Sequence, residues 1–227
     1  MTVSRKLKDA LLKFLMYLAS GAVFALLAFL IGYILFKGTG HITLKFLTSK
    51  PSLVRDTVEI LPNILNTLYI IIITIIIVLP LGVGAAVYLN EYAKNKKAVR
   101  IIELATETLA GIPSIIYGLF GMLFFVTAVK WGYSILAGSF TLAIMVLPTI
   151  IRSTEEALLA VDDSYREGSF GLGAGKLRTV FVIVLPSAAS GILSGIILSI
   201  GRIVGETAAL IYTAGTVAKI PESVFDS

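Results

Sequence analysis

The sequence predicts an all-α membrane protein, a polytopic bundle of hydrophobic helices, and three observations support this fold class. Of the 227 residues, 57% are hydrophobic and only 15% are charged, and the mean hydropathy is +0.94. Soluble domains are nearer half apolar and about a quarter charged. The apolar residues gather in long runs, and a helix needs about 20 apolar residues to cross a bilayer core. Helices are favoured over strands because a helix satisfies its own backbone hydrogen bonds in lipid.

Five apolar runs are long enough to cross the membrane. The first is too long for the apolar part of a signal peptide and lacks a clear cleavage site. The second is rich in isoleucine. The third and fourth contain Pro113 and Pro148, which either kink a span or simply pack, and the fifth has Pro186 near its start. The predicted spans cover about residues 14–36, 64–89, 108–129, 133–151 and 180–212, in one transmembrane domain over residues 1–227.

The distribution of Lys and Arg predicts the orientation, because cytoplasmic loops carry an excess of these residues. The N-terminal segment and the linkers after the second and fourth spans hold twelve: Arg5, Lys6, Lys8, Lys13, Lys94, Lys96, Lys97, Arg100, Arg152, Arg166, Lys176 and Arg178. The opposite side holds six: Lys37, Lys45, Lys50, Arg55, Lys130 and Lys219. The N-terminus is therefore predicted to be cytoplasmic and the end of the chain to lie outside.

Composition also excludes several classes of function. The chain has no cysteine, which excludes disulfides, thiolate chemistry and Cys-based metal sites. A single histidine, His41, cannot make a metal site by itself. The net charge of +5 does not indicate a nucleic-acid partner, because the basic residues lie in the linkers between apolar runs.

Two formal charges, Arg202 and Glu206, fall well inside the predicted spans. A charge at the bilayer centre costs about 2.5–3.5 kcal/mol on insertion scales, so such residues suggest function. A spacing of four places both on one face of a helix. One interpretation is a self-neutralising pair that helps helices to pack. The other is a polar route, on which the arginine binds an oxyanion through two parallel hydrogen bonds and the glutamate moderates its affinity.

Arg152 and Thr207 are further candidates for this route. Arg152 follows the fourth predicted span and is either a path residue or an ordinary cytoplasmic anchor. The hydroxyl of Thr207 lies next to Glu206 and either faces the route or bonds back to its own helix.

The linker of about residues 153–178 is the most informative cytoplasmic segment. Asp162, Asp163 and Ser164 are able to cap a short helix over residues 165–170. Glycines at 171, 173 and 175 then predict a turn into the last span. They do not make a phosphate-binding P-loop, because Phe170 stands where that motif needs glycine and Leu177 where it needs Ser or Thr. We therefore expect no direct binding of ATP by this chain.

The same linker carries a family resemblance. Glu167, Gly168 and Ser169 are followed by Gly173 and then by residues 183–186, Ile-Val-Leu-Pro. This resembles the EAA signature of bacterial ABC-importer permeases: Glu-Ala-Ala, three residues, Gly, nine residues, Ile, one residue, Leu-Pro. Gly168 and Ser169 stand in place of the two alanines, and the spacing matches throughout.

Further segments resemble one branch of that family. Residues 201–210, Gly-Arg-Ile-Val-Gly-Glu-Thr-Ala-Ala-Leu, are similar to the GRxxGETA segment of phosphate-importer permeases, and residues 110–121 are also similar. The alanine after Thr207 favours the A-type subunit (PstA-like) over its C-type relative (PstC-like). The resemblance covers about residues 63–215.

The resemblance implies a type I ABC importer permease (MetI-like) fold and a subunit without catalytic activity of its own. Its expected partners are a homologous PstC-like permease, a PstB-like ATPase dimer that binds ATP and Mg, and an extracytoplasmic PstS-like phosphate-binding protein. Phosphate is the implied substrate, passing Arg152, Arg202 and Glu206 in a bacterial or archaeal plasma membrane. The EAA segment is implied to form a coupling helix in a cleft of the ATPase. Glu167 either pairs with a basic group there or caps its own helix, and Gly168 and Ser169 allow close docking.

Other functions stay open beside this one. A permease for sulfate or molybdate belongs to the same class, and the Arg-Glu-Thr segment argues against it. A passive channel or secondary transporter would work without an ATPase, and the EAA spacing argues against it. A membrane scaffold would use Arg202 and Glu206 for packing alone. Family members usually have six spans, so either this protein has five or the given sequence stops before the sixth.

Overall fold

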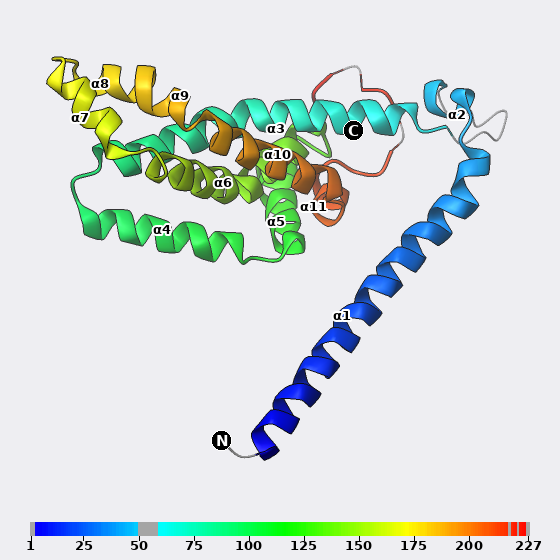
Figure 1. The fold of residues 1–227 in the computed structure, drawn as a ribbon. Helices are drawn as coiled ribbons and strands as arrows, with labels where there is room; N and C mark the ends of the chain where they lie inside the picture. Colours follow the sequence, from blue (N-terminus) through cyan, green and yellow to red (C-terminus); the bar gives the residue numbers. More distant parts are fainter. Residues whose placement is uncertain (1–2, 50–58, 218, 222, 226–227) are drawn as a thin grey trace. The chain divides into compact units, whose positions relative to one another are not determined.

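The computed structural model describes residues 3–49, 59–217, 219–221 and 223–225 (Figure 1). Lys50 and Arg55, which entered the charge count above, lie outside the described residues. The described part is helical, without strands. It divides into two compact units, one up to Leu61 and one from Pro62 onward, and each is considered by itself.

The first unit is dominated by one long helix, α1 (Val3–Gly38), which contains the first predicted span. A 3₁₀ turn, Thr39–His41, and the short helix α2 (Leu44–Thr48) follow. The hydroxyl of Thr43 caps α2 by accepting a hydrogen bond from the Phe46 amide at 3.2 Å. The large apolar side chains of α1, such as Phe24 and Phe36, are exposed. Lipid or another protein surface has to cover them, because soluble surfaces do not carry apolar patches of this size.

The second unit contains the remaining helices, three of which pass into a π-helical turn. Its elements are α3 (Leu61–Val87), η2 (Tyr88–Tyr92), α4 (Lys96–Ala110), α5 (Ser114–Gly121), η3 (Met122–Ala128), α6 (Ile135–Leu159), α7 (Asp163–Gly171), α8 (Lys176–Thr179), η4 (Val180–Val184), α9 (Leu185–Ser187), α10 (Ala189–Gly205) and α11 (Ala208–Thr213).

By length and composition, three described helices can cross a membrane: Lys8–His41, Leu61–Tyr92 and Ile135–Leu159. Two bent pairs bring the number to five if each pair is one span. These pairs fall where continuous spans are predicted over 108–129 and 180–212. The first bends by 97° between α4 and α5, and the second by 64° between α9 and α10. The kink considered for Pro113 is therefore present near the start of the span predicted over 108–129, and the bend between α9 and α10 lies within the span predicted over 180–212.

The first bend keeps its backbone satisfied. The segment between α4 and α5 contains Gly111 and Pro113, and proline removes a backbone donor and disfavours a helical conformation in the residue before it. The Tyr117 hydroxyl donates to the carbonyl oxygen of Leu109, in the last turn of α4, at 2.7 Å. The Leu109 carbonyl also accepts from the Ile112 amide at 3.1 Å, so this end of α4 has hydrogen-bond partners at the bend.

Helix α6 forms the core of the second unit. Ser134 caps its start, accepting from the Ala137 amide at 3.2 Å. Leu142, Met145, Ile150 and Leu158 are fully buried along it. In Figure 1, α4 runs alongside α6 while α5 turns across it, and α7 and α8 lie at the other end of the bundle.

Two glycines bring α10 very close to α6. A Cβ added at Gly191 would lie 2.6 Å from Ala157 Cβ, and one added at Gly195 would lie 2.5 Å from Ser153 Cβ. Small residues spaced by four allow helix backbones to approach within a membrane, where packing replaces the hydrophobic effect. This contact fixes which residues of α10 face α6.

Alanine at Gly195 is expected to destabilise the fold, by about 1–3 kcal/mol, because the added methyl group overpacks the α6–α10 contact. Gly201 lies on the same helix, and a Cβ there meets nothing within 4 Å. Gly201→Ala therefore serves as the control and should be neutral or stabilising by about 0.5–1 kcal/mol, the usual helix preference for alanine. Thermal unfolding of the detergent-solubilised chain measures both. Equal stability of the two variants would contradict the packing described.

Candidate functional site

Arg202 lies in the last turn of α10, partly buried against α6. Its Nη1 donates to the Thr149 hydroxyl at 3.4 Å, a long and therefore weak hydrogen bond. Ion pairs among the described residues involve other arginines, not Arg202. The guanidinium thus keeps most of its hydrogen-bonding capacity for a group beyond those described.

Glu206 does not neutralise Arg202 in this structure. α10 ends at Gly205, and Glu206 has an extended backbone with ψ 122°. Its Oε1 accepts a hydrogen bond from the Ala209 amide at 3.0 Å, at the start of α11. Because the helix stops between the two residues, the spacing of four no longer places them side by side. The self-neutralising pair is not formed, and Glu206 acts as a helix cap.

Thr207 occupies the break between α10 and α11. Its side chain is exposed and makes no capping hydrogen bond to α11. Its carbonyl oxygen accepts from the Ile211 amide at 3.1 Å, so the backbone joins α11. The helical conformation is broken between α4 and α5 and again between α10 and α11, and the second helix of each pair, α5 and α11, packs on the other. A Cβ at Gly118 would lie 2.8 Å from the Cα of Ala209.

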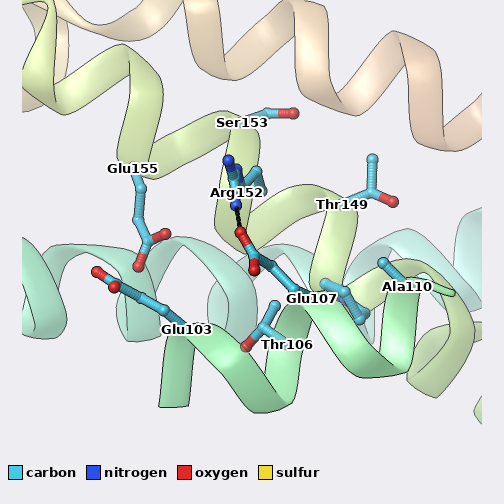
Figure 2. Close-up of a pocket in the computed structure, with 9 residues that line it drawn as sticks. Glu103, Thr106, Glu107, Ala110, Thr149, Arg152, Ser153 and Glu155 are labelled. Carbon is cyan, nitrogen blue, oxygen red and sulfur yellow. Dashed lines mark hydrogen bonds and ion pairs between the residues drawn. The ribbon is translucent and has the colours of Figure 1, made fainter. Parts of the chain in front are cut away.

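Arg152 is held by two carboxylates at the surface of α6. Its Nη1 pairs with Glu107 on α4 (Figure 2), and its Nε pairs with Glu156 at 3.2 Å. The Arg152 and Glu107 side chains are about half exposed, at 54% and 55%. The cationic charge is thus already compensated within the chain.

A cavity of about 330 Å³ opens between α4 and α6 beside this pair. It is lined by Glu103, Thr106, Glu107, Ala110, Pro148, Thr149, Arg152, Ser153 and Glu155. Thr149 lines the cavity and also bonds Arg202, so it connects the cavity to the membrane arginine. With three glutamates against one arginine, the lining repels an anion. An oxyanion could bind Arg152 here only by displacing Glu107.

The linker forms the short helix and glycine turn predicted for it. Asp162 caps α7 by accepting from the Ser164 amide at 2.8 Å. Hydrogen bonds from the side chain and the backbone of Ser164 lower the pKa of Asp162 below its ordinary value. Gly173 has a positive φ of 84°, which favours glycine, and it turns the chain from α7 toward α8.

The residues of the EAA segment point in different directions. Glu167 and Gly168 are exposed, and a Cβ at Gly168 would meet nothing within 4 Å. Ser169 is buried, and its hydroxyl lies 2.8 Å from that of Thr179 in a hydrogen bond that joins α7 to α8. Ser169 therefore holds the segment together and does not offer its side chain to a partner. Since Asp162 caps α7, the capping role considered for Glu167 is not needed.

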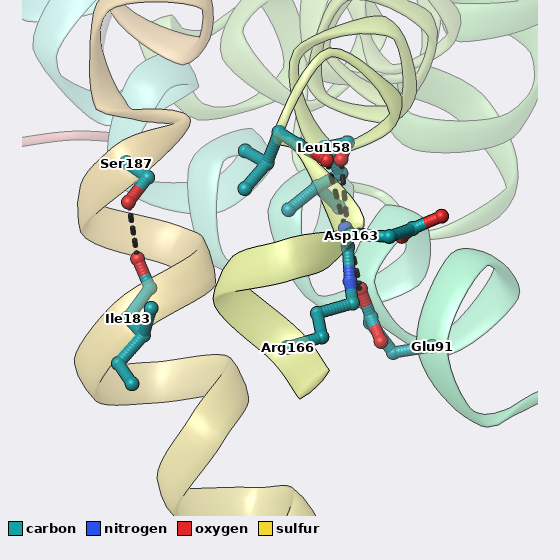
Figure 3. Close-up of polar contacts among 7 residues, drawn as sticks. Glu91, Leu158, Asp163, Arg166, Ile183 and Ser187 are labelled. Atoms are coloured by element: carbon teal, nitrogen blue, oxygen red, sulfur yellow. Dashed lines mark hydrogen bonds and ion pairs between the residues drawn. The ribbon is translucent and has the colours of Figure 1, made fainter. Parts of the chain in front are cut away.

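Arg166 is a residue that sequence reasoning used only in the charge count. Its Nε and Nη2 donate to Glu91 Oε1 in η2 at 3.1 and 2.9 Å (Figure 3). It also bonds the carbonyl oxygens of Val161 and Leu158 at 2.9 and 3.0 Å, and Asp163 at 3.0 Å. The Arg166 and Glu91 side chains are only 15% and 9% exposed. The pair spans 75 positions of sequence, so no local pattern indicates it.

No group of three or more His, Cys, Asp or Glu residues able to hold a metal ion occurs among the described residues. The charged groups described above offer recognition of charge by the guanidinium of Arg202 and by the paired guanidinium of Arg152.

The sequence is similar to those of known transport proteins. The model of the binding-protein-dependent transport system inner membrane component family matches residues 79–223. The chain is 38% identical to a probable ABC transporter permease, YqgI, of Bacillus subtilis, over 94% of this chain and 72% of that protein. It is 34% identical to the phosphate transport system permease PstA of Pasteurella multocida, over 92% and 75%. The PstA of Mycobacterium leprae is 39% identical over 68% of this chain and 51% of its own length.

The two interhelical ion pairs should differ sharply in their contribution to stability. Removing one partner of a buried pair costs about 3–5 kcal/mol, because the other charge stays buried without compensation. An exposed pair contributes only about 0–1 kcal/mol. We therefore expect Glu91→Leu to lower the unfolding free energy much more than Glu107→Leu, measured by denaturant or thermal unfolding in detergent. Similar losses for both variants would contradict the burial described.

Proposed function

The chain belongs to the family of binding-protein-dependent transport system inner membrane components, and on this premise we propose that it is the A-type permease subunit of an ATP-driven phosphate importer. Members of the family are permease subunits of ABC transporters and cross the plasma membrane several times. The assignment of phosphate as the transported substrate goes beyond membership of the family. It is supported by the relatives named PstA and by the GRxxGETA segment around Arg202.

The position of Arg202 carries the proposal. An arginine in an apolar bundle is costly unless its charge is compensated. Here it has one weak hydrogen bond, to Thr149, and Glu206 is engaged elsewhere. A tetrahedral oxyanion supplies both the negative charge and the acceptor oxygens that a guanidinium fork requires. We assign Arg202 as the anion-binding residue of the path, with Thr149 and Thr207 as neighbouring hydroxyl groups.

Arg152 has a different role in this proposal. Its charge is shared with Glu107 and Glu156, so it attracts an anion only when that pairing opens. A path must bind its cargo weakly enough to release it. Competition between Glu107 and phosphate for Arg152 provides such a weak step at the mouth of the cavity between α4 and α6.

The coupling segment supports an ATPase partner. Around the exposed Glu167 and Gly168 lie three exposed apolar side chains, Tyr165, Phe170 and Leu172, of which Leu172 is 91% exposed. Such side chains on a short helix suit a protein groove. We propose that an ATPase dimer, which binds ATP and Mg itself, docks on this surface, which is then cytoplasmic. The distribution of Lys and Arg supports a cytoplasmic N-terminus. A second, C-type permease and an extracytoplasmic phosphate-binding protein complete the importer.

Replacing Arg202 by Gln should abolish phosphate uptake while the complex still assembles, because the amide keeps polarity and loses the charge. Uptake of labelled phosphate into proteoliposomes that contain the full complex measures this. The control is Arg100→Gln on the exposed face of α4, which should transport normally. Normal uptake by the Arg202 variant would remove the arginine from the path.

Glu167→Arg tests the docking surface. Reversing the charge on α7 should weaken binding of the ATPase, and uptake should fall together with co-purification of the two proteins. Asp9→Arg, in the exposed N-terminal part of α1, provides the charge-matched control. Undiminished co-purification together with normal uptake would refute a docking role for Glu167.

A further inference from the structure

The attachment of α7 to the rest of the bundle rests on polar bonds, not on apolar packing. The apolar cluster at this end of the bundle includes Ala86 and Leu89 near the end of α3, Leu158 in α6 and Val180 and Val184 in η4. No residue of α7 belongs to that cluster among the described residues. Its buried contacts are instead the Ser169–Thr179 hydrogen bond and the bonds of Arg166.

The connections of α7 to α6 and to α3 differ in kind. α6 ends at Leu159 and α7 begins at Asp163, so the chain itself carries any movement between these two helices. α3 and η2 are 75 positions away from α7 and have no such covalent connection. The apolar cluster packs the end of α3 against α6, and the Arg166–Glu91 pair adds a direct bond between η2 and α7. Glu91 in η2 is bonded twice by Arg166, which also holds the carbonyl oxygens at the α6 terminus.

η2 receives a second contact from the same coupling segment. The ammonium group of Lys176, at the start of α8, lies 5.0 Å from the ring centroid of Tyr92, next to Glu91. The attraction between a cation and an aromatic face is worth about 0.5–1 kcal/mol at exposed sites. Arg166 of α7 and Lys176 of α8 thus both contact η2, the π-helical turn that follows α3.

We propose that the Arg166–Glu91 pair is the positioning element that makes α3 follow α7 when the ATPase moves the coupling helix. In this role Arg166 does not contact the transported anion. It joins α7, the end of α6 and the π-helical turn after α3 at the position where the ATPase would act. The proposal rests on the function proposed above, since it needs an ATPase that moves α7. Two donors of the guanidinium bond one carboxylate oxygen of Glu91, and two further bonds reach carbonyl oxygens. Lysine could not make this set of hydrogen bonds, because it lacks the planar fork of donors.

The test uses the complete importer in nanodiscs and benefits from a chain without native cysteine. Spin labels are attached at Ser164→Cys on α7 and Tyr88→Cys in η2, two exposed positions outside the proposed docking side chains, and the label-to-label distance is measured without nucleotide and with ATP. With the pair intact we expect the same narrow distribution in both states. In Arg166→Gln the distribution should broaden or shift on addition of ATP. The same narrow distribution in both states of Arg166→Gln would overturn the proposal.

Transport efficiency gives the second readout. ATP hydrolysed per phosphate transported should rise in Arg166→Gln by about 2–30-fold, the range known for residues that couple distant sites. Asp163→Asn is the matched control, because it removes the exposed partner of Arg166 and leaves Glu91 in place. Control values equal to those of Arg166→Gln would overturn the assignment to Glu91.

Two further outcomes separate the possible failures. If Arg166→Gln prevents assembly, Glu91→Gln is tested with the same two measurements. Its amide oxygen still accepts a hydrogen bond from Arg166, but the negative charge is lost. An effect smaller than that expected for Arg166→Gln supports the proposal, and no effect overturns it. If the unaltered complex moves no phosphate, the proposed function fails, whereas the distance measurement still judges the Arg166–Glu91 connection.

Discussion

The close contact between α10 and α6 is the constraint from which the rest of the second unit follows. Gly191 and Gly195 let the two backbones approach against Ala157 and Ser153. Two turns further along α10, the same approach brings Arg202 to Thr149. A larger side chain in this contact would move the arginine away from α6 and from the cavity beside it. The packing of Gly191 and Gly195 on α6 therefore also positions the charge of Arg202.

The C-terminal half of α6 connects the two parts of the proposed mechanism. One part is the path, where Thr149 and Arg152 line a cavity next to α4. The other is the coupling segment, where Arg166 bonds the Leu158 carbonyl and Glu91. A displacement of α7 therefore reaches α6 through the chain and α3 through the ion pair. Because Arg152 lies on α6 and its partner Glu107 on α4, relative movement of these helices alters the pairing that we propose to compete with an anion.

Sequence reasoning reached the all-α class, the family and the short helix in the linker, because apolar runs, caps and fixed motif spacing are local properties. It placed Arg202 and Glu206 on one helical face by their spacing, and this failed because the helix ends between them. Periodicity also cannot indicate where a run bends, although Gly111 and Pro113 mark one bend. The pairs Arg152–Glu107 and Arg166–Glu91 join residues 45 and 75 positions apart, and only the tertiary fold brings them together.

Reconstitution of the unaltered chain with its permease partner, ATPase and binding protein tests the central claim most directly. Uptake of labelled phosphate into proteoliposomes is measured with and without ATP, and in competition with sulfate. We predict uptake that requires ATP and the binding protein and that sulfate does not inhibit. Uptake without ATP would instead identify a passive route, and preferential uptake of sulfate a different oxyanion; either result would contradict the account.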